Sequence, residues 1–94
     1  MQHDDFEWDD AKAAQNLAKH GVSFEAGRLA FDDAFAVARE DRRHDYGEER
    51  FILLGMVQER LLAVSYGVRG EQVRIISARF AEPQERRRYH EENS

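Results

Sequence analysis

The chain of 94 residues contains no cysteine, one proline and no long hydrophobic run. Without cysteine it forms no disulfide and no thiolate metal site, and a reducing compartment is expected. No apolar stretch approaches the roughly 18 residues that a membrane-spanning helix needs. The first residues, MQHDDFEWDD, are acidic and polar, unlike a signal peptide. We therefore expect one cytoplasmic domain over residues 1–94, with no membrane partner.

Clustered metal ligands are also lacking. His3, His44 and His90 are scattered among acidic residues and show no ligand spacing. We therefore assign no metal site and no cofactor.

Positive charge is unevenly distributed along this acidic chain, whose formal net charge is −5. Residues 1–59 carry 7 Lys and Arg against 14 Asp and Glu, whereas residues 60–94 carry 7 arginines against 5 glutamates. An acidic chain is unsuited to coating nucleic acid nonspecifically. A local arginine cluster still suits a few phosphates, because guanidinium groups make short bidentate contacts. The sequence thus permits a small phosphate site towards its carboxyl end.

The first helix is predicted over 11–20. Asp9 is its N-cap candidate, and Gly21 is a natural terminator after the last turn. The apolar residues that fall on one stripe of this helix are Ala14, Leu17 and Ala18.

Two further helices are predicted from capping signals. Ser23 caps a short helix over 24–31 without a capping box, and Gly27 weakens its interior. Pro83 suits the first position of a last helix over 83–92.

The strands follow from runs of apolar residues. Strands are predicted at 6–8, 35–41, 50–57, 60–67 and 71–80. The runs 50–57 and 60–67 are apolar on both faces, so we expect central strands joined as a hairpin near Gln58 and Glu59. They carry more apolar residues than two helices cover. The prediction is an α+β fold with two N-terminal helices and a C-terminal helix around a sheet of three or four antiparallel strands.

Strict alternation assigns the faces of strand 71–80. It places Arg79 with Val73, Ile75 and Ser77 on one face, and Phe80 with Arg74, Ile76 and Ala78 on the other.

Four segments in order carry a resemblance to a known family. They are FEWDDAKAAQNLAKHGVSFEAG at 6–27, FDD at 31–33, GEERFILLG at 47–55 and RIISARFAEPQERRRYHEE at 74–92. Together they resemble the BrnT family of bacterial toxins, over nearly the whole chain. The resemblance implies a RelE-like fold and a metal-independent endoribonuclease acting on RNA. It also implies a BrnA-like ribbon-helix-helix antitoxin, binding of operator DNA only through that antitoxin, and a heterotetramer of two toxins and two antitoxins.

The chain departs from the family pattern at two places. Where the resemblance leads us to expect Thr-Glu-Arg-Gly, the chain has Gly67-Val68-Arg69-Gly70. Where we expect a lysine after SAR, it has Phe80. Both changes remove polar or charged groups near the implied site and weaken the expected ribonuclease activity.

Two arginines are the candidates for stabilising charge on a cleaved phosphate. Arg69 lies on the predicted turn at 67–70 and Arg79 ends the last strand, so the two can converge on one phosphate. The alternative is that each is a surface arginine paired with a glutamate such as Glu71 or Glu82.

The arginines of the last helix point in three directions, because successive helical positions do not share a face. We expect at least two of Arg86, Arg87 and Arg88 to be solvated, with one facing the sheet beside Arg79. Arg74 and Arg87 are the candidate substrate-binding residues.

His20 and Tyr89 complete the candidate catalytic set with Arg69 and Arg79. Histidine has a reference pKa near neutrality, so His20 is a candidate for acid or base work, but its place before Gly21 equally fits a cationic helix C-cap. Tyr89 can donate to a phosphate or pack its ring.

Three functions remain open from the sequence. The first is a ribonuclease toxin, and the second is a catalytically weak module that binds antitoxin and acts in autoregulation. The third is a small α+β protein without a nucleic-acid role.

Overall fold

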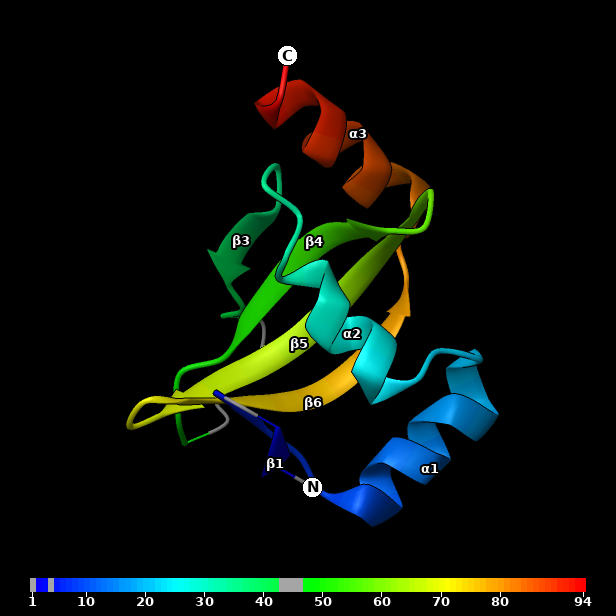
Figure 1. Ribbon diagram of the computed structural model, residues 1–94. Coiled ribbons are helices and arrows are strands. Elements are labelled where there is room, and N and C mark those ends of the chain that lie inside the picture. The colour runs from blue at the N-terminus through cyan, green and yellow to red at the C-terminus, as the bar shows by residue number, and fades with distance from the viewer. Residues whose placement is uncertain (1, 4, 43–46) are drawn as a thin grey trace.

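Three helices pack around one mixed sheet in the part of the chain that the computed structural model describes, residues 2–3, 5–42 and 47–94 (Figure 1). The strands are β1 (Gln2–His3), β2 (Phe6–Glu7), β3 (Val37–Glu40), β4 (Phe51–Val57), β5 (Arg60–Arg69) and β6 (Gln72–Phe80). The helices are α1 (Asp10–His20), α2 (Phe24–Ala30) and α3 (Pro83–Glu92). The predicted α+β class and all three predicted helices are confirmed.

The sheet is larger than predicted and is not wholly antiparallel. Its strand order is β1-β2-β6-β5-β4-β3, which makes six described strands instead of three or four. The short strand β2 runs parallel to β6, with Phe6 opposite Val73 and Glu7 opposite Arg74. Strands of two residues carry almost no periodic signal, and their pairing is set by the neighbouring strand.

The central hairpin is confirmed. Strand β5 lies between β4 and β6, and Val57 pairs with Arg60 across a two-residue turn. Gln58 and Glu59 in that turn have φ values of 49° and 67°. Positive φ at both central residues is the turn geometry that matches the twist of paired strands.

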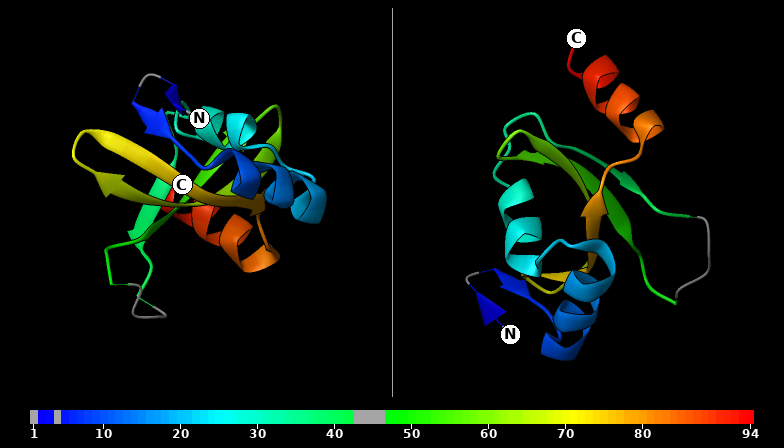
Figure 2. Two further views of the ribbon diagram at one scale, coloured as in Figure 1. Left: turned by 90° about the horizontal axis from the view of Figure 1, so that it is seen from below. Right: turned by 90° about the vertical axis from the view of Figure 1, so that its right-hand side faces the viewer.

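The two faces of the sheet are covered by different helices (Figure 2). Helices α1 and α2 cover one face, and α3 lies on the other, where it projects beyond the end of the strands (Figures 1 and 2). The buried residues under α1 and α2 are Trp8, Val22, Phe24, Ala30, Leu53, Leu62, Val64, Ile75 and Ala78. Those on the α3 face are Ile52, Leu54, Leu61, Ala63, Ala81 and Tyr89.

Helix α1 has the predicted caps but a different buried side. Asp9 accepts a hydrogen bond from the backbone N–H of Lys12, and Gly21 ends the helix in the left-handed region. The predicted stripe of Ala14, Leu17 and Ala18 is wrong, because Leu17 is 51% exposed and both alanines are exposed. Ala13 and Asn16 face the core instead.

Asn16 is buried because it docks α1 on β6. Its Nδ2 donates to the carbonyl oxygens of Val22 at 2.9 Å and Ala78 at 2.7 Å, and its Oδ1 accepts from the Ala78 N–H at 3.2 Å. A buried amide with its donors and its acceptor satisfied is tolerated in a core. Because Asn16 is polar, the pattern of apolar residues did not predict that it is buried.

A bulge in β6 changes the predicted faces. Ser65 pairs with Ser77 but Tyr66 pairs with Ile75, so Ile76 is the extra residue. Beyond the bulge the alternation is shifted by one, and Ala78 and Phe80 lie opposite Val64 and Leu62 on the α1–α2 face. The prediction that Arg79 shares a face with Val73 and Ile75 is therefore wrong. Arg79 lies opposite Ala63, on the α3 face.

The glycine inside α2 has a packing role. Ser23 caps this helix by accepting from the Ala26 N–H, as predicted. A Cβ placed on Gly27 would lie 3.2 Å from the Ala78 Cβ. Gly27 thus lets α2 approach β6 closely, which offsets its low helix propensity.

The predicted charged connection before β4 lies partly at 43–46, outside the described residues. Among the described helices, none has the length and apolar character that crossing a bilayer requires.

Candidate active site

Arg79 is held at the end of β6 by an acidic residue of α3. Its Nη1 and Nη2 donate to Glu85 Oε1 and Oε2 at 2.8 and 3.0 Å. The two side chains are 29% and 12% exposed. The sequence analysis offered as an alternative that Arg79 pairs with a glutamate such as Glu71 or Glu82. In the structure Arg79 does pair with a glutamate, which is Glu85.

Glu85 has two further features that fix it. Its Oε1 also accepts from the Glu82 N–H at 2.8 Å, which closes a capping box at the start of α3. Burial pushes the pKa of Glu85 upward, but the hydrogen bonds from Arg79 and the Glu82 N–H, with the charges of Arg79 and Arg88, bring it below its usual value. Glu85 is therefore a carboxylate at neutral pH.

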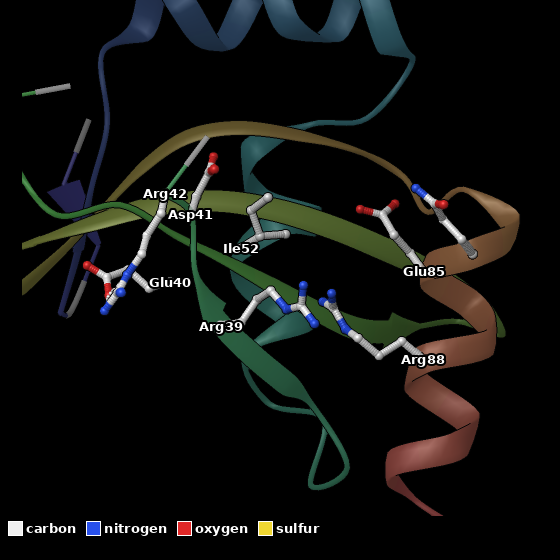
Figure 3. A pocket seen from close by; sticks show the side chains of 8 residues that line it. Arg39, Glu40, Asp41, Arg42, Ile52, Glu85 and Arg88 are labelled. Carbon is white, nitrogen blue, oxygen red and sulfur yellow. Dashed lines mark hydrogen bonds and ion pairs between the residues drawn. The ribbon is translucent and has the colours of Figure 1, made fainter. Parts of the chain in front are cut away.

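A groove of about 610 Å³ opens beside this ion pair, between β3 and α3 (Figure 3). It is lined by Arg39, Glu40, Asp41 and Arg42 from β3 and its continuation, Ile52 from β4, and Gln84, Glu85 and Arg88 from α3. Figure 3 shows the guanidinium groups of Arg39 and Arg88 pointing toward one another across the groove.

Tyr89 anchors α3 on the sheet. Its ring is 6% exposed within the cluster on the α3 face, and its hydroxyl donates to Asp33 Oδ2 at 2.6 Å. Asp33 also accepts from the backbone N–H groups of Met56 and Phe35. Burial and the Asp33 carboxylate together raise the pKa of Tyr89 to about 12.

The pKa of Asp33 is subject to two opposing effects, burial and its hydrogen bonds. Burial pushes the pKa of Asp33 upward, but the hydrogen bonds from Tyr89 and the two backbone N–H groups outweigh it and leave a lowered pKa. This arrangement is that of a structural clamp between α3 and the sheet.

The chain matches a known protein family over most of its length. Residues 8–85 match the family model described as the ribonuclease toxin BrnT of type II toxin–antitoxin systems. The chain belongs to the BrnT family. No curated protein matches it. The family is one of ribonuclease toxins, and a type II system implies an antitoxin partner.

The structure does not bring the two candidate catalytic arginines of this BrnT chain together. Arg69 pairs with Gln72 at the tip of the β5–β6 hairpin, whereas Arg79 pairs with Ala63 at the other end. Six residues of extended strand separate those ends, or about 20 Å. The two therefore cannot converge on one phosphate.

The remaining sequence candidates are spread over the molecule. His20 ends α1 on the opposite face of the sheet from α3. Arg74 lies near the α1 N-terminus, where its charge adds to the Lys12 N–H in lowering the pKa of Asp9. Arg87 is exposed and does not line the groove.

The residues of the last helix that reach the groove are ones that the sequence reading did not select. Arg88, and not Arg87, faces the sheet, and Arg86 donates from Nη1 to the Ala81 carbonyl oxygen at 3.1 Å. The packing of α3 on the sheet, through Tyr89 and the Arg79–Glu85 pair, determines which direction each arginine takes. Glu85 had a signal in the sequence, since it stands three residues after Glu82 at a helix start.

The departures from the family pattern are placed at two separate sites. A Cβ placed on Gly67 would lie 3.5 Å from the Glu49 carbonyl oxygen. Val68 is 56% exposed near the hairpin tip. Phe80 faces the α1–α2 side, with the Arg60 guanidinium carbon 5.2 Å from its ring centre. Phe80 therefore contributes no charge on the face of Arg79.

Within the described ranges no group of three or more histidine, cysteine, aspartate or glutamate side chains is arranged to hold a metal ion. His44, one of the histidines considered in the sequence, lies outside those ranges.

Proposed function

We propose that this BrnT chain cleaves RNA as a metal-independent endoribonuclease and is neutralised by a cognate BrnA-like ribbon-helix-helix antitoxin. The complex holds two toxins and two antitoxins, and operator DNA is bound only by the antitoxin. The observation that carries the proposal is the position of Arg79 beside a groove into which Arg39 and Arg88 point, in a chain with a net charge of −5. Concentrated arginines in an acidic chain suit a local polyanion contact.

The chemistry uses the RNA's own 2′-hydroxyl as the nucleophile. Its oxygen forms a bond to the adjacent phosphorus while the bond from phosphorus to O5′ breaks, leaving a 2′,3′-cyclic phosphate and a 5′-hydroxyl. One proton leaves the 2′-hydroxyl to a base, and one is delivered to O5′. The phosphorane gains negative charge, which the Arg79 guanidinium stabilises.

Glu85 occupies the place of the substrate phosphate before RNA binds. Its carboxylate meets the Arg79 fork in the bidentate geometry that a phosphate also adopts. An incoming phosphate exchanges with this carboxylate, and the pKa of Glu85 then rises because a stabilising hydrogen bond is lost. The displaced carboxylate is the base for the 2′-hydroxyl in this proposal.

A second function is favoured by the same ion pair. Arg79 is already compensated by Glu85, and Phe80 adds no charge beside it. Both features suit a catalytically weak module that mainly binds antitoxin and acts in autoregulation. Growth arrest upon expression without antitoxin would distinguish the ribonuclease from this alternative.

Substitution of Arg79 tests the proposal. Removing one positioned donor of this kind lowers the rate roughly 10²–10³-fold, so Arg79→Ala should abolish growth arrest and RNA cleavage. Arg79→Lys should restore activity partly, because it keeps the charge but loses the fork. Cleavage is measured on purified RNA in excess EDTA, where the parent should keep its rate.

The control is Arg60→Ala, which removes an arginine from the opposite face of the sheet and should leave cleavage unchanged. Thermal melts of each variant separate lost chemistry from lost folding, since Arg79 also ties α3 to β6. Parental cleavage by Arg79→Ala, or loss of cleavage in EDTA with recovery in Mg²⁺, would refute this mechanism.

A further inference from the structure

Arg39 and Arg88 are two like charges brought face to face by different elements. Arg39 comes from β3 and Arg88 from the second turn of α3, and their guanidinium groups converge over the groove (Figure 3). In the described part of the chain, no hydrogen bond or ion pair joins Arg39 to an acidic side chain. Arg88 Nε is buried without a hydrogen-bond partner there, and its ion pair with Glu92 spans 3.5 Å.

Such an arrangement calls for an anion between the two cations. Like charges at short range repel each other, and the apolar side chain of Ile52 beside them reduces screening by water. The nearby carboxylates are already engaged, because Glu85 binds Arg79 and Glu40 accepts from Arg42. An external anion would offset the repulsion and accept the hydrogen bond that the Arg88 Nε–H does not make within the described residues, where it has only the 3.5 Å ion pair with Glu92.

We propose that Arg39 and Arg88 together bind a backbone phosphate of the RNA strand, next to the phosphate at Arg79. The proposal rests on the ribonuclease function above and assigns the substrate contacts of the groove. Glu85 links the two positions, since it lines the groove and also holds Arg79. Consecutive phosphates along one strand would then contact the groove and Arg79 in turn.

A phosphate fits this pair better than an acidic protein segment does. One tetrahedral anion accepts N–H donors from two opposing directions, as the two converging forks require. RNA brings one phosphate charge per nucleotide, which suits a site made by a single pair of arginines.

Binding of a non-cleavable RNA tests the site. A 2′-O-methyl oligonucleotide keeps its phosphates but lacks the nucleophile, and its affinity is measured by fluorescence anisotropy at several salt concentrations. Arg39→Ala and Arg88→Ala should each weaken binding about tenfold, as expected for a lost charge-assisted hydrogen bond. Each should also lower the slope of log affinity against log salt by about 0.7, the value for one phosphate on a single strand.

Matched variants distinguish a phosphate contact from a structural effect. Arg88→Lys keeps the charge, so it should keep the salt slope while losing part of the affinity. Arg87→Ala removes the neighbouring, exposed arginine of the same helix and should stay within twofold of the parent. On cleavable RNA, Arg39→Ala should raise KM about tenfold and leave kcat within twofold.

The outcomes separate this site from the function on which it rests. Unchanged affinity and salt slope in both alanine variants, with a parent that cleaves RNA, would overturn the groove and leave the ribonuclease standing. Weakened antitoxin binding with unchanged RNA binding would assign the groove to the antitoxin and also overturn it. A parent that neither binds nor cleaves RNA would remove the ribonuclease and the groove proposal together.

Discussion

Tyr89 is the residue on which the position of α3 depends. Its hydroxyl joins Asp33, which stands 56 residues earlier in the chain, and its ring fills the cluster on the α3 face. Asp33 in turn holds the backbone of β4 through the Met56 N–H. This hydrogen bond connects α3 with the sheet in addition to the Arg79–Glu85 ion pair. The hydroxyl for which the sequence suggested catalysis therefore has a structural contact.

Tyr89→Phe should change stability and leave catalysis intact. Loss of a hydrogen bond to a charged group costs about 1.5–3 kcal/mol, whereas kcat should stay within threefold. Folded Tyr89 has a pKa of about 12, above the ordinary value of 10.0. Its contribution to stability is therefore complete below pH 10 and is lost as the pH rises towards 12. Tyr89→Phe should remove the last step of the tyrosinate absorbance titration; a hundredfold loss of kcat without loss of stability would contradict the structural role.

Three adjacent arginines show what a sequence can and cannot predict at this scale. Helix geometry alone predicts that Arg86, Arg87 and Arg88 diverge, and they do. The identity of the one that faces the sheet depends on how the helix is rotated, and the Tyr89–Asp33 and Arg79–Glu85 contacts both constrain that rotation. The sequence predicted that one of the three faces the sheet without identifying it, and in the structure Arg88 lines the groove.

At the scale of elements, Asn16 couples α1 to β6 close to Arg79. The residue it holds, Ala78, immediately precedes Arg79. Strand β2 pairs with only two residues of β6, Val73 and Arg74. Further along the same edge, the Asn16 amide binds the N–H and the carbonyl oxygen of Ala78, as a neighbouring strand would. The helix thus fixes the strand from which Arg79 projects.

Asn16→Asp should destabilise the fold strongly. The change preserves shape but replaces two N–H donors by an oxygen that faces the carbonyl oxygens of Val22 and Ala78. An uncompensated buried charge costs about 3–5 kcal/mol. Gln15→Glu is the matched control, since it makes the same chemical change at an exposed neighbour and should stay within about 0.5 kcal/mol. The urea midpoint measures both variants, and equal midpoints would contradict the docking role of Asn16.

Capping and turn residues made the helix starts and the hairpin turn predictable from the sequence. The register between paired strands was harder to predict. Asp9, Ser23 and Pro83 start their helices as the sequence indicated, and Gln58 with Glu59 forms the predicted turn. The bulge at Ile76 was missed because it is defined by the register against β5, and no residue of β6 alone signals it. That single shift moved Arg79 to the face of α3 and so decided where the candidate active site lies.

At the scale of the molecule, α3 changes the reason for expecting a partner. The sequence suggested that the apolar hairpin strands exceed what two helices cover, but the second face of that hairpin is packed under α3. The large apolar side chains that are exposed in the described residues are Leu17, Leu29, Phe35, Val68 and Phe80. The expectation of an antitoxin therefore rests on membership of the BrnT family.

An antitoxin that binds only the folded toxin must raise its melting temperature. At a free antitoxin concentration near 100 times Kd the stabilisation is about 2.7 kcal/mol, which for a domain of this size corresponds to about 10–20 °C. Trp8 is 4% exposed and packs edge-on against Phe24, so its fluorescence reports the unfolding of the core. The melt is recorded with a tryptophan-free form of the antitoxin encoded beside the toxin, and with a non-cognate ribbon-helix-helix protein as control. A melting temperature that depends on the cognate protein's concentration is expected because binding acts by mass action, and one that stays constant up to a large excess would rule out this partnership.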